Sequence, residues 1–294
     1  MNEESLMRSR IRKILMICSN YDAFALEEDG RIENQVKNEY RELNLSNPPK
    51  FIWANSSAQA RDIIGSEEDI DMIICMYNEQ DKEIFPFASR LKDEGRGIPF
   101  ILLIHYSKAV RQRVLESPHP GVDFVFSWHG NADLILAIVK LLEDAANAEN
   151  DVFEVGVKGI LLVEDSIRYY SNYLPELYKI VLTQSREFLT ESLNDDQKKY
   201  RKRSRPKIFL ATCLEEAIAY FEKYRRNLLG VISDVGMVFH KGDDPKTEKL
   251  DAGIDLVRII REYDPLMPVL LQSSQGSLAK TAAGLGVGFL KKYS

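Results

Sequence analysis

Short apolar runs alternate with longer amphipathic stretches along the whole chain. In the first half, the apolar runs cover residues 13–19, 51–54, 72–76, 100–105 and 123–127, with helical patterns between them and a last helical pattern at about 131–148. Short runs rich in β-branched residues predict strands, and strands that alternate with helices predict βαβ units. We therefore expect the α/β class, with a doubly wound parallel sheet covered by helices on both faces.

The second half repeats this pattern at the scale of a whole domain. ILMICSN (14–20) lines up with ILLVEDS (160–166), FIWANSSAQA (51–60) with IFLATCLEEA (208–217), and IPFILLIHYS (98–107) with MPVLLQSSQG (267–276). A chain of 294 residues has room for two such domains. We expect five strands in each, with domains at 1–150 and 156–294 and a polar linker at about 145–156.

The second copy carries two insertions. The segment 166–206 is longer than a typical connection and has apolar residues at helical spacing. It predicts a long first helix, or a helix pair, from Ile167 to about Leu193, with Pro175 kinking the helix or starting the second one. The polar segment 240–251 predicts a mobile loop near the carboxyl end of the third strand.

The chain ends at Ser294, directly after the fifth apolar run of the second copy. We expect this domain to lack its last helix, which leaves one apolar face of the sheet uncovered. Three kinds of cover are expected for that face: another copy of the chain in a homodimer, the first half of this chain, or a segment that follows Ser294 in a longer protein.

Five polar residues stand at the carboxyl ends of the apolar runs in the second copy. They are Glu164, Asp165, Asp234, Ser273 and Lys292. The carboxyl ends of parallel strands share one edge, so we expect these side chains to converge on a single cleft. Clustered carboxylates suit a hard cation such as Mg²⁺, and one carboxylate can act as the nucleophile that accepts a phosphoryl group. The hydroxyl and the ammonium group would then meet the phosphoryl oxygens.

This arrangement resembles the receiver domain of two-component response regulators, in the segments ILLVEDS (160–166), VISDVGM (231–237), PVLLQSS (268–274) and GFLKK (288–292). The resemblance implies a flavodoxin-like fold and Asp234 as the phosphoacceptor. It implies Mg²⁺ held by Asp165, Asp234 and the Gly236 carbonyl, with Glu164 acting through water. Ser273 stands at the place of the switch hydroxyl, and Lys292 at that of the Lys that contacts the phosphoryl group. The implied partner is a histidine kinase or a phosphotransfer protein.

The first copy has the same strand pattern without this chemistry. Cys18 and Ser19 replace the acidic pair, Met76 replaces the acceptor Asp, and Ser127 replaces the Lys. A thioether cannot take a phosphoryl group. We therefore interpret the first half as a pseudo-receiver that serves for contact and not for phosphotransfer.

A fuller resemblance covers nearly the whole chain. The segments 20–35 and 164–178 and the ending FLKKYS are similar to the tandem-receiver N-terminal region of certain large bacterial proteins. Those proteins carry a phosphoenolpyruvate-synthase-like or pyruvate-phosphate-dikinase-like portion downstream. The resemblance implies a downstream catalytic region in cis, although these 294 residues contain none of its nucleotide- or pyruvate-binding chemistry.

Composition narrows the classes of function. The net charge of −6 gives no global basic field for nucleic acid. The basic run 198–207 has one aromatic residue and no helix-turn-helix context, so we interpret it as a solvated face of the insertion. No apolar run approaches the ~18 residues of a membrane span. The three cysteines fall in apolar, strand-like runs, which indicates buried free thiols in a reducing cytoplasm.

Three classes of function remain. The first is a signalling receiver phosphorylated by a histidine kinase, and the second is a non-phosphorylated interaction module that regulates an attached catalytic region. The third is a phosphohydrolase with an Asp nucleophile, which usually has a second Asp two residues on; Gly236 stands there instead. We favour a regulatory protein and not an enzyme, with at most self-phosphorylation and dephosphorylation chemistry.

Overall fold

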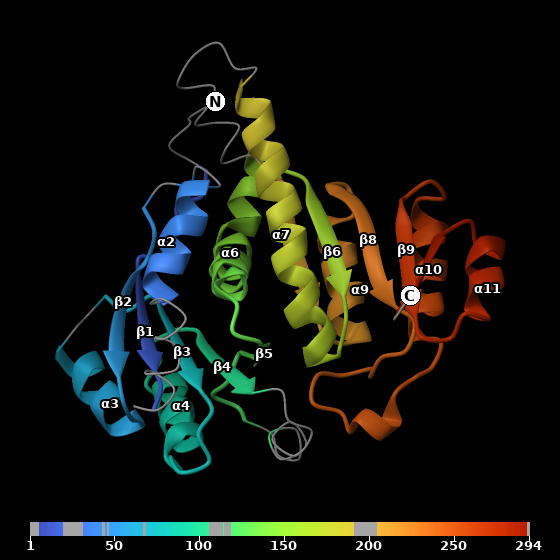
Figure 1. Cartoon of the computed structure of the whole chain (residues 1–294). Coiled ribbons are helices and arrows are strands. Elements are labelled where there is room, and N and C mark those ends of the chain that lie inside the picture. Colours follow the sequence, from blue (N-terminus) through green and yellow to red (C-terminus); the bar gives the residue numbers. More distant parts are fainter. Residues whose placement is uncertain are drawn as a thin grey trace. The chain divides into compact units, whose positions relative to one another are not determined.

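The computed structural model describes residues 6–19, 32–42, 45, 47–66, 69–105, 114, 119–190 and 205–292. The chain packs as two compact units (Figure 1). The first unit comprises Arg10–Lys140 and Ser171–Leu177, and the second comprises Met1–Ser9, Leu141–Tyr170 and Tyr178–Ser294. Three of the four boundaries between the units fall inside helices. The division at 1–150 and 156–294 stays a prediction about the repeat.

The first unit is built on a five-stranded parallel sheet in the order β2-β1-β3-β4-β5. The central strand β3 has every residue buried, as expected for a strand covered on both faces. The five predicted strands agree with the observed ones to within two residues at each end. The strands are β1 (Lys13–Ile17), β2 (Lys50–Ala54), β3 (Met72–Met76), β4 (Phe100–His105) and β5 (Phe124–Trp128), and the helices are α2 (Ile32–Glu42), α3 (Ser57–Ser66), α4 (Ile84–Asp93) and α6 (Ala132–Glu149).

The second unit repeats this topology. Its strands pair in the order β10-β9-β8-β6-β7, again all parallel. Counted along each half, both sheets have the strand order 2-1-3-4-5, the flavodoxin-like doubly wound order. The predicted α/β class, with two doubly wound five-stranded parallel sheets, is therefore confirmed. The strands are β6 (Gly159–Val163), β7 (Lys207–Ala211), β8 (Leu228–Asp234), β9 (Val269–Ser273) and β10 (Gly288–Lys291), and the helices are α7 (Ile167–Thr190), α9 (Leu214–Tyr224), α10 (Ala252–Tyr263) and α11 (Leu278–Gly284).

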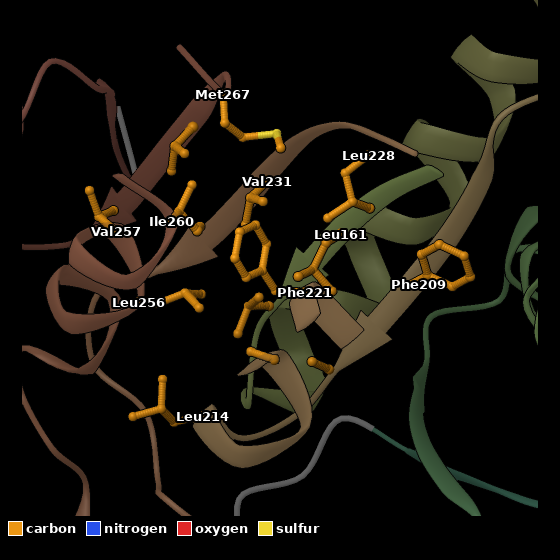
Figure 2. Packing of buried hydrophobic residues seen from close by; sticks show 14 of the residues in the cluster. Leu161, Phe209, Leu214, Phe221, Leu228, Val231, Leu256, Val257, Ile260 and Met267 are labelled. Carbon is orange, nitrogen blue, oxygen red and sulfur yellow. The ribbon is translucent and has the colours of Figure 1, made fainter. Parts of the chain in front are cut away.

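Aliphatic and aromatic side chains fill the space between the sheet of the second unit and helices α9 and α10 (Figure 2). Leu161 and Val231 come from neighbouring strands, and Phe221 of α9 reaches them from the helix layer. Helix α9 packs against β6 and β7 and also against α10. Burial of this apolar surface fixes which side chains of each strand point inward and, with them, the register of the strands. The register decides which residues lie side by side at the carboxyl edge of the sheet.

Helix α7 is one continuous helix of 24 residues, with Pro175 inside it. The expectation of one long helix is thus confirmed over the described residues, while Leu193 lies outside them. Pro175 does not end the helix. Flanking side chains such as Leu174 and Tyr178 are almost fully buried, and this packing offsets the backbone hydrogen bond that a proline cannot donate.

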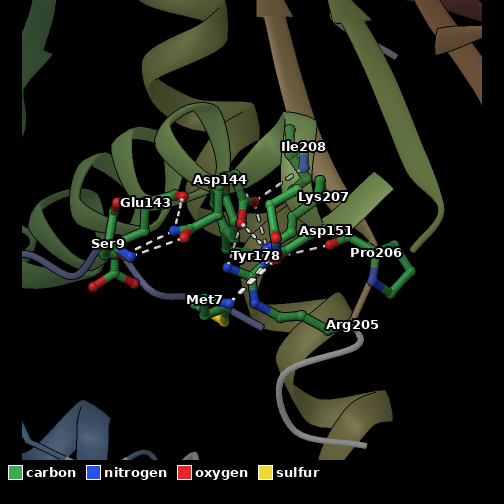
Figure 3. Close-up of polar contacts among 12 residues, drawn as sticks. Met7, Ser9, Glu143, Asp144, Asp151, Tyr178, Arg205, Pro206, Lys207 and Ile208 are labelled. Carbon is green, nitrogen blue, oxygen red and sulfur yellow. Dashed lines mark hydrogen bonds and ion pairs between the residues drawn. The ribbon is translucent and has the colours of Figure 1, made fainter. Parts of the chain in front are cut away.

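The predicted linker at 145–156 is wrong as a description of local structure. Helix α6 continues to Glu149, and a turn of π-helix, η2 (Asn150–Glu154), follows it. Asp151 in this segment and Asp144, directly before it, are fully buried. Asp144 and Asp151 form ion pairs with Arg205 and Lys207 (Figure 3). Both cations belong to the basic run 198–207, which was predicted to be a solvated face.

The ion pairs of this buried cluster are well defined. The two terminal nitrogens of Arg205 lie 2.9 and 2.8 Å from the two carboxylate oxygens of Asp144. Lys207 Nζ lies 2.6 Å from Asp151 Oδ2 and 3.6 Å from Asp144 Oδ1. Asp144 also accepts hydrogen bonds from the Tyr178 hydroxyl and the Ile208 amide. The solvated-face interpretation is therefore wrong for Arg205 and Lys207, and residues 198–204 lie outside the described residues.

Among the helices that the structure describes, none combines the length and apolar character needed to cross a bilayer. The three cysteines are buried and unoxidised, as the apolar runs around them predicted. At the far edge of the second sheet, β10 is poorly covered: Leu290 is 46% exposed.

Candidate functional site

The carboxyl edge of the second sheet carries the five predicted residues. Glu164 and Asp165 follow β6, Asp234 ends β8, Ser273 ends β9, and Lys292 follows β10. The ladder continues past the strand ends, because the Glu164 amide donates to the Ala211 carbonyl and the Lys292 amide to the Ser273 carbonyl. These backbone hydrogen bonds hold the residues side by side at the carboxyl edge of the sheet. The prediction that they share an edge is therefore confirmed by the register of the strands.

The charged groups lie in direct contact. Carboxylate oxygens of Glu164, Asp165 and Asp234 all lie within 4.8 Å of one another. Lys292 Nζ lies 2.8 Å from Glu164 Oε2 and 2.5 Å from Asp234 Oδ2. The Lys292 side chain is buried, while the neighbouring Lys291 is exposed. Strand alternation lets one lysine of the pair face the cleft, and the structure places Lys292 there.

Burial and mutual repulsion shift the protonation of these groups. Burial first, and then the charge of Asp234, raise the pKa of Glu164 to about 8 against the opposing effect of Lys292. Burial, Asp234 and Glu248 together raise the pKa of Asp165 to about 6. For Lys292, burial lowers the pKa, but the charges of Glu164 and Asp234 outweigh it and raise the pKa overall. The cluster thus contains three carboxylates and one ammonium group, which contacts two of them, so it keeps an excess of negative charge.

Two glycines near the end of β8 have neighbours too close for a side chain, and one of them, Gly253, lets helix α10 approach that strand. The Gly253 amide donates to the Val235 carbonyl at 2.8 Å, and a Cβ built on Gly253 would overlap the Asp234 carbonyl oxygen. A Cβ built on Gly236 would overlap Oε1 of Glu248. Only glycine fits at either place without a shift of its neighbours.

A cavity of about 260 Å³ opens at this edge. Four of its lining residues were predicted from the sequence, namely Asp234, Gly236, Ser273 and Lys292. Glu164 and Asp165 are not among the residues that line the cavity. Residues that sequence reasoning did not assign to the site complete the lining, namely Tyr169, Glu248, Leu250, Ser274 and Gln275.

Tyr169 comes from the first turn of α7, directly after the acidic pair. Its ring centroid lies 4.1 Å from Lys292 Nζ, a cation–π distance, so the ring covers one side of the ammonium group. Its position five residues after Glu164 was the available signal. The sequence pattern indicates only that Tyr169 belongs to an amphipathic helix. The fold is needed to show that its ring lies against Lys292 in the cavity lining.

Glu248 and Leu250 come from the polar segment 240–251, which was predicted to lie near the acceptor. This segment contains a short 3₁₀ turn, η3 (Pro245–Thr247), and an antiparallel bridge between Met237 and Lys249. Two backbone hydrogen bonds of 3.2 and 3.0 Å form the bridge. The bridge thereby holds Glu248, the residue before Lys249, at the cavity. The mobility of the segment 240–251 stays a prediction.

The donor set fits a hard divalent cation. Three carboxylates offer oxygen ligands within a few ångströms, which is the chemistry that Mg²⁺ prefers. Burial first, and then repulsion from Asp234, raises the pKa values of Glu164 and Asp165, and a cation would relieve this repulsion. Asp165, Asp234 and the Gly236 carbonyl are the groups that could hold the cation, with Glu164 acting through water.

The corresponding edge of the first unit has a different character. Cys18, Met76 and Ser127 occupy the matching places, and all three are buried. The Ser127 amide donates to the Ser171 hydroxyl at 2.9 Å. A thiol, a thioether and a hydroxyl give no hard anionic ligand, so the contrast that the sequence predicted between the two copies is present in the residues at the two edges.

Comparison with known proteins gives only distant similarities. No protein-family model matches the chain, and no curated protein sequence matches it. A solved structure described as a "probable two-component system response regulator/GGDEF domain protein" is 19% identical, covers 96% of this chain and 92% of its own, and has a TM-score of 0.36. A second structure with a similar description is 17% identical over the same shares, with a TM-score of 0.38.

A glucose-galactose binding protein from Geobacillus stearothermophilus also matches, at 11% identity over 95% of this chain and 84% of its own, with a TM-score of 0.25. At such TM-scores none of these similarities carries a functional argument. The function proposed below depends on the geometry of the site itself.

Proposed function

We propose that the second unit is a phosphoryl-accepting regulatory module of two-component signal transduction, with Asp234 as the acceptor. The observation that carries this proposal is the contact of Lys292 with both Asp234 and Glu164 at the edge where Asp165 and Ser273 also lie. A nucleophilic carboxylate, an acidic pair, a hydroxyl and an ammonium group are the parts that acyl phosphate formation requires.

In the proposed reaction an oxygen of Asp234 attacks the phosphorus of a phosphohistidine on a histidine kinase or a phosphotransfer protein. The new P–O bond replaces the P–N bond, and the donor imidazole leaves. Lys292 moves from its ion pair with Asp234 to a phosphoryl oxygen, and the Ser273 hydroxyl donates to another. When bound, Mg²⁺ neutralises charge on the carboxylates and the phosphoryl group, held by Asp165, Asp234 and the Gly236 carbonyl.

The alternative is a non-phosphorylated module that regulates an attached phosphoenolpyruvate-synthase-like catalytic region. The buried Cys18, Met76 and Ser127 at the edge of the first unit favour this contact role for that unit. The two roles are compatible in one cytoplasmic regulatory protein, in which the second unit takes the phosphoryl group and the first makes contacts. In either role the chain is a regulator and not an enzyme.

The first experiment is phosphorylation by acetyl phosphate with Mg²⁺, read by intact-mass spectrometry and by peptide mapping after borohydride trapping. We expect one phosphoryl group per chain, on Asp234, and none in Asp234→Asn, because an amide is not a nucleophile for this reaction. Asp251→Asn, which removes a nearby exposed carboxylate, is the matched control and should be phosphorylated like the wild type. Modification that persists in Asp234→Asn would show that the acceptor is wrong.

A further inference from the structure

Glu248 is a charged residue of the pocket that none of the strand ends supplies. It lies in the segment between β8 and α10, and its Oε1 occupies the space that a side chain at Gly236 would take. The Glu248 carboxylate thus lies against Gly236, two residues after Asp234, and it lines the same cavity as Asp234 and Lys292. Its charge also raises the pKa of Asp165.

The position of Glu248 is set by backbone contacts on its carboxyl side. Lys249 forms the two-bond antiparallel bridge with Met237, and its ammonium group pairs with Asp255 of α10. Glu248 is thus held from the next residue, although its own side chain is exposed. A carboxylate in this position attracts a cation that enters the pocket and repels the anionic group of a phosphoryl donor.

We propose that Glu248 is a specificity-determining residue of this pocket, which favours the cation and opposes the phosphoryl donor, so that the cation binds first. The inference rests on the proposed function only for its second half. Glu164, Asp165, Asp234 and Glu248 oppose the single charge of Lys292, and an entering phosphoryl group adds further negative charge. A divalent cation reverses much of this excess, and the donor then meets a site close to neutral.

The test compares Glu248→Gln with Asp251→Asn, which removes the same charge from the same exposed segment but does not line the cavity. The Asp251 side chain makes no capping hydrogen bond, so the control leaves the start of α10 intact. Glu248→Asp, which keeps the charge, is a second variant and should resemble the wild type. All variants are the full chain.

The first readout is the affinity for Mn²⁺, measured by titrating each variant with the metal in the absence of any phosphodonor. We expect Glu248→Gln to bind Mn²⁺ about two- to fivefold more weakly, the size of an exposed charge pair, and Asp251→Asn to match the wild type. The second readout is the rate of phosphorylation by acetyl phosphate at saturating Mg²⁺. Here we expect Glu248→Gln to react about two- to fivefold faster, with an advantage that shrinks as salt is added.

The opposite sign of the two effects separates charge from misfolding, because a structural defect would weaken both. Weakening of both, equality of Glu248→Gln with Asp251→Asn, or a wild type that binds no Mn²⁺ would overturn the inference. If no variant is phosphorylated but Mn²⁺ affinity still falls in Glu248→Gln alone, the proposed function fails and the role of Glu248 toward the cation stands.

Discussion

The second unit holds two clusters of buried carboxylates, and they differ in how well their charge is balanced. In the cluster around Asp144, two carboxylates meet two cations, Arg205 and Lys207, at ion-pair distance. At the carboxyl edge of the sheet, three carboxylates lie together and Lys292 pairs with two of them, Glu164 and Asp234. The pKa of Glu164 is raised to about 8 at that edge.

The difference separates a structural role from a ligand-binding one. A balanced, fully buried cluster does not attract an additional ion. Its ion pairs and hydrogen bonds fix one arrangement of α6, η2 and β7. An unbalanced cluster beside a cavity is destabilising by itself, and a cation or a proton relieves it.

The largest effect is expected from Asp144→Asn. It removes the carboxylate that both Arg205 and Lys207 contact and leaves Asp151 and Glu143 as the buried acids nearby, and breaking a buried pair in this way costs about 3–5 kcal/mol of unfolding free energy. The loss should be similar at pH 5 and pH 8, because Arg205, whose pKa is raised, keeps its charge in that range. Urea unfolding followed by circular dichroism measures it.

The control for Asp144→Asn is Glu149→Gln, on the same helix. Glu149 pairs with Lys223, but both side chains are largely exposed, so its loss should leave the urea midpoint unchanged. A small effect of Asp144→Asn, comparable with that of the control, would mean that the buried cluster does not hold the second unit together.

An intermediate effect is expected from Lys292→Met, which removes the single cation from the unbalanced cluster. Without a divalent cation, we expect a loss of about 1–3 kcal/mol at pH 8, smaller than for Asp144→Asn because carboxylates can take up protons to relieve their repulsion. The loss should shrink at pH 5 for the same reason. Lys291→Met is the matched control, since Lys291 is exposed, and its stability should equal that of the wild type. A pH-independent loss in Lys292→Met would contradict the charge argument.

The smallest effect is expected from Glu164→Gln in the presence of a chelator. The pKa of Glu164 in the folded chain, about 8, lies above its ordinary value of 4.5, so the folded state holds more protons than the unfolded state between these values. The free energy of unfolding therefore falls as the pH rises from about 4.5 to 8. Glu164→Gln removes this dependence.

At pH 8 the Glu164→Gln variant should be more stable than the wild type, by on the order of 1 kcal/mol, and the difference should vanish toward pH 5. Lys292 keeps Asp234 as its partner in the variant. Thermal unfolding at several pH values gives the comparison, with Glu149→Gln as a charge-loss control. Parallel pH profiles for the wild type and Glu164→Gln would show that Glu164 is already ionised at neutral pH.

The alternation of apolar runs and amphipathic stretches was enough to predict ten strands and the order of the helices. Strands buried on both faces need apolar residues at nearly every position, so β3 and β9 are visible as runs. The site could be predicted because Asp234, Ser273 and Lys292 stand directly at strand ends, and a parallel sheet brings such ends together. The register that sets the height of these residues follows from the same apolar pattern.

The failed predictions concern residues whose environment depends on partners distant in sequence. The segment at 145–156 is polar, and Arg205 with Lys207 is basic, so each taken alone indicates solvent. Their burial follows only because Asp144 and Asp151 meet these cations across 61 and 56 residues of chain respectively (205 − 144 and 207 − 151). Glu248 and Tyr169 were missed for a similar reason, since neither stands at a strand end.

The α/β class, the repeat, and the convergence of Glu164, Asp165, Asp234 and Lys292 on one sheet edge could therefore be predicted from the chain, because local periodicity and strand ends encode them. Only the fold showed which lysine faces the cleft, which polar residues are buried, and that Glu248 lines the same cavity as Asp234. The physical reason is that the burial of a charge is decided by its counter-charge, and the counter-charges here lie far along the chain.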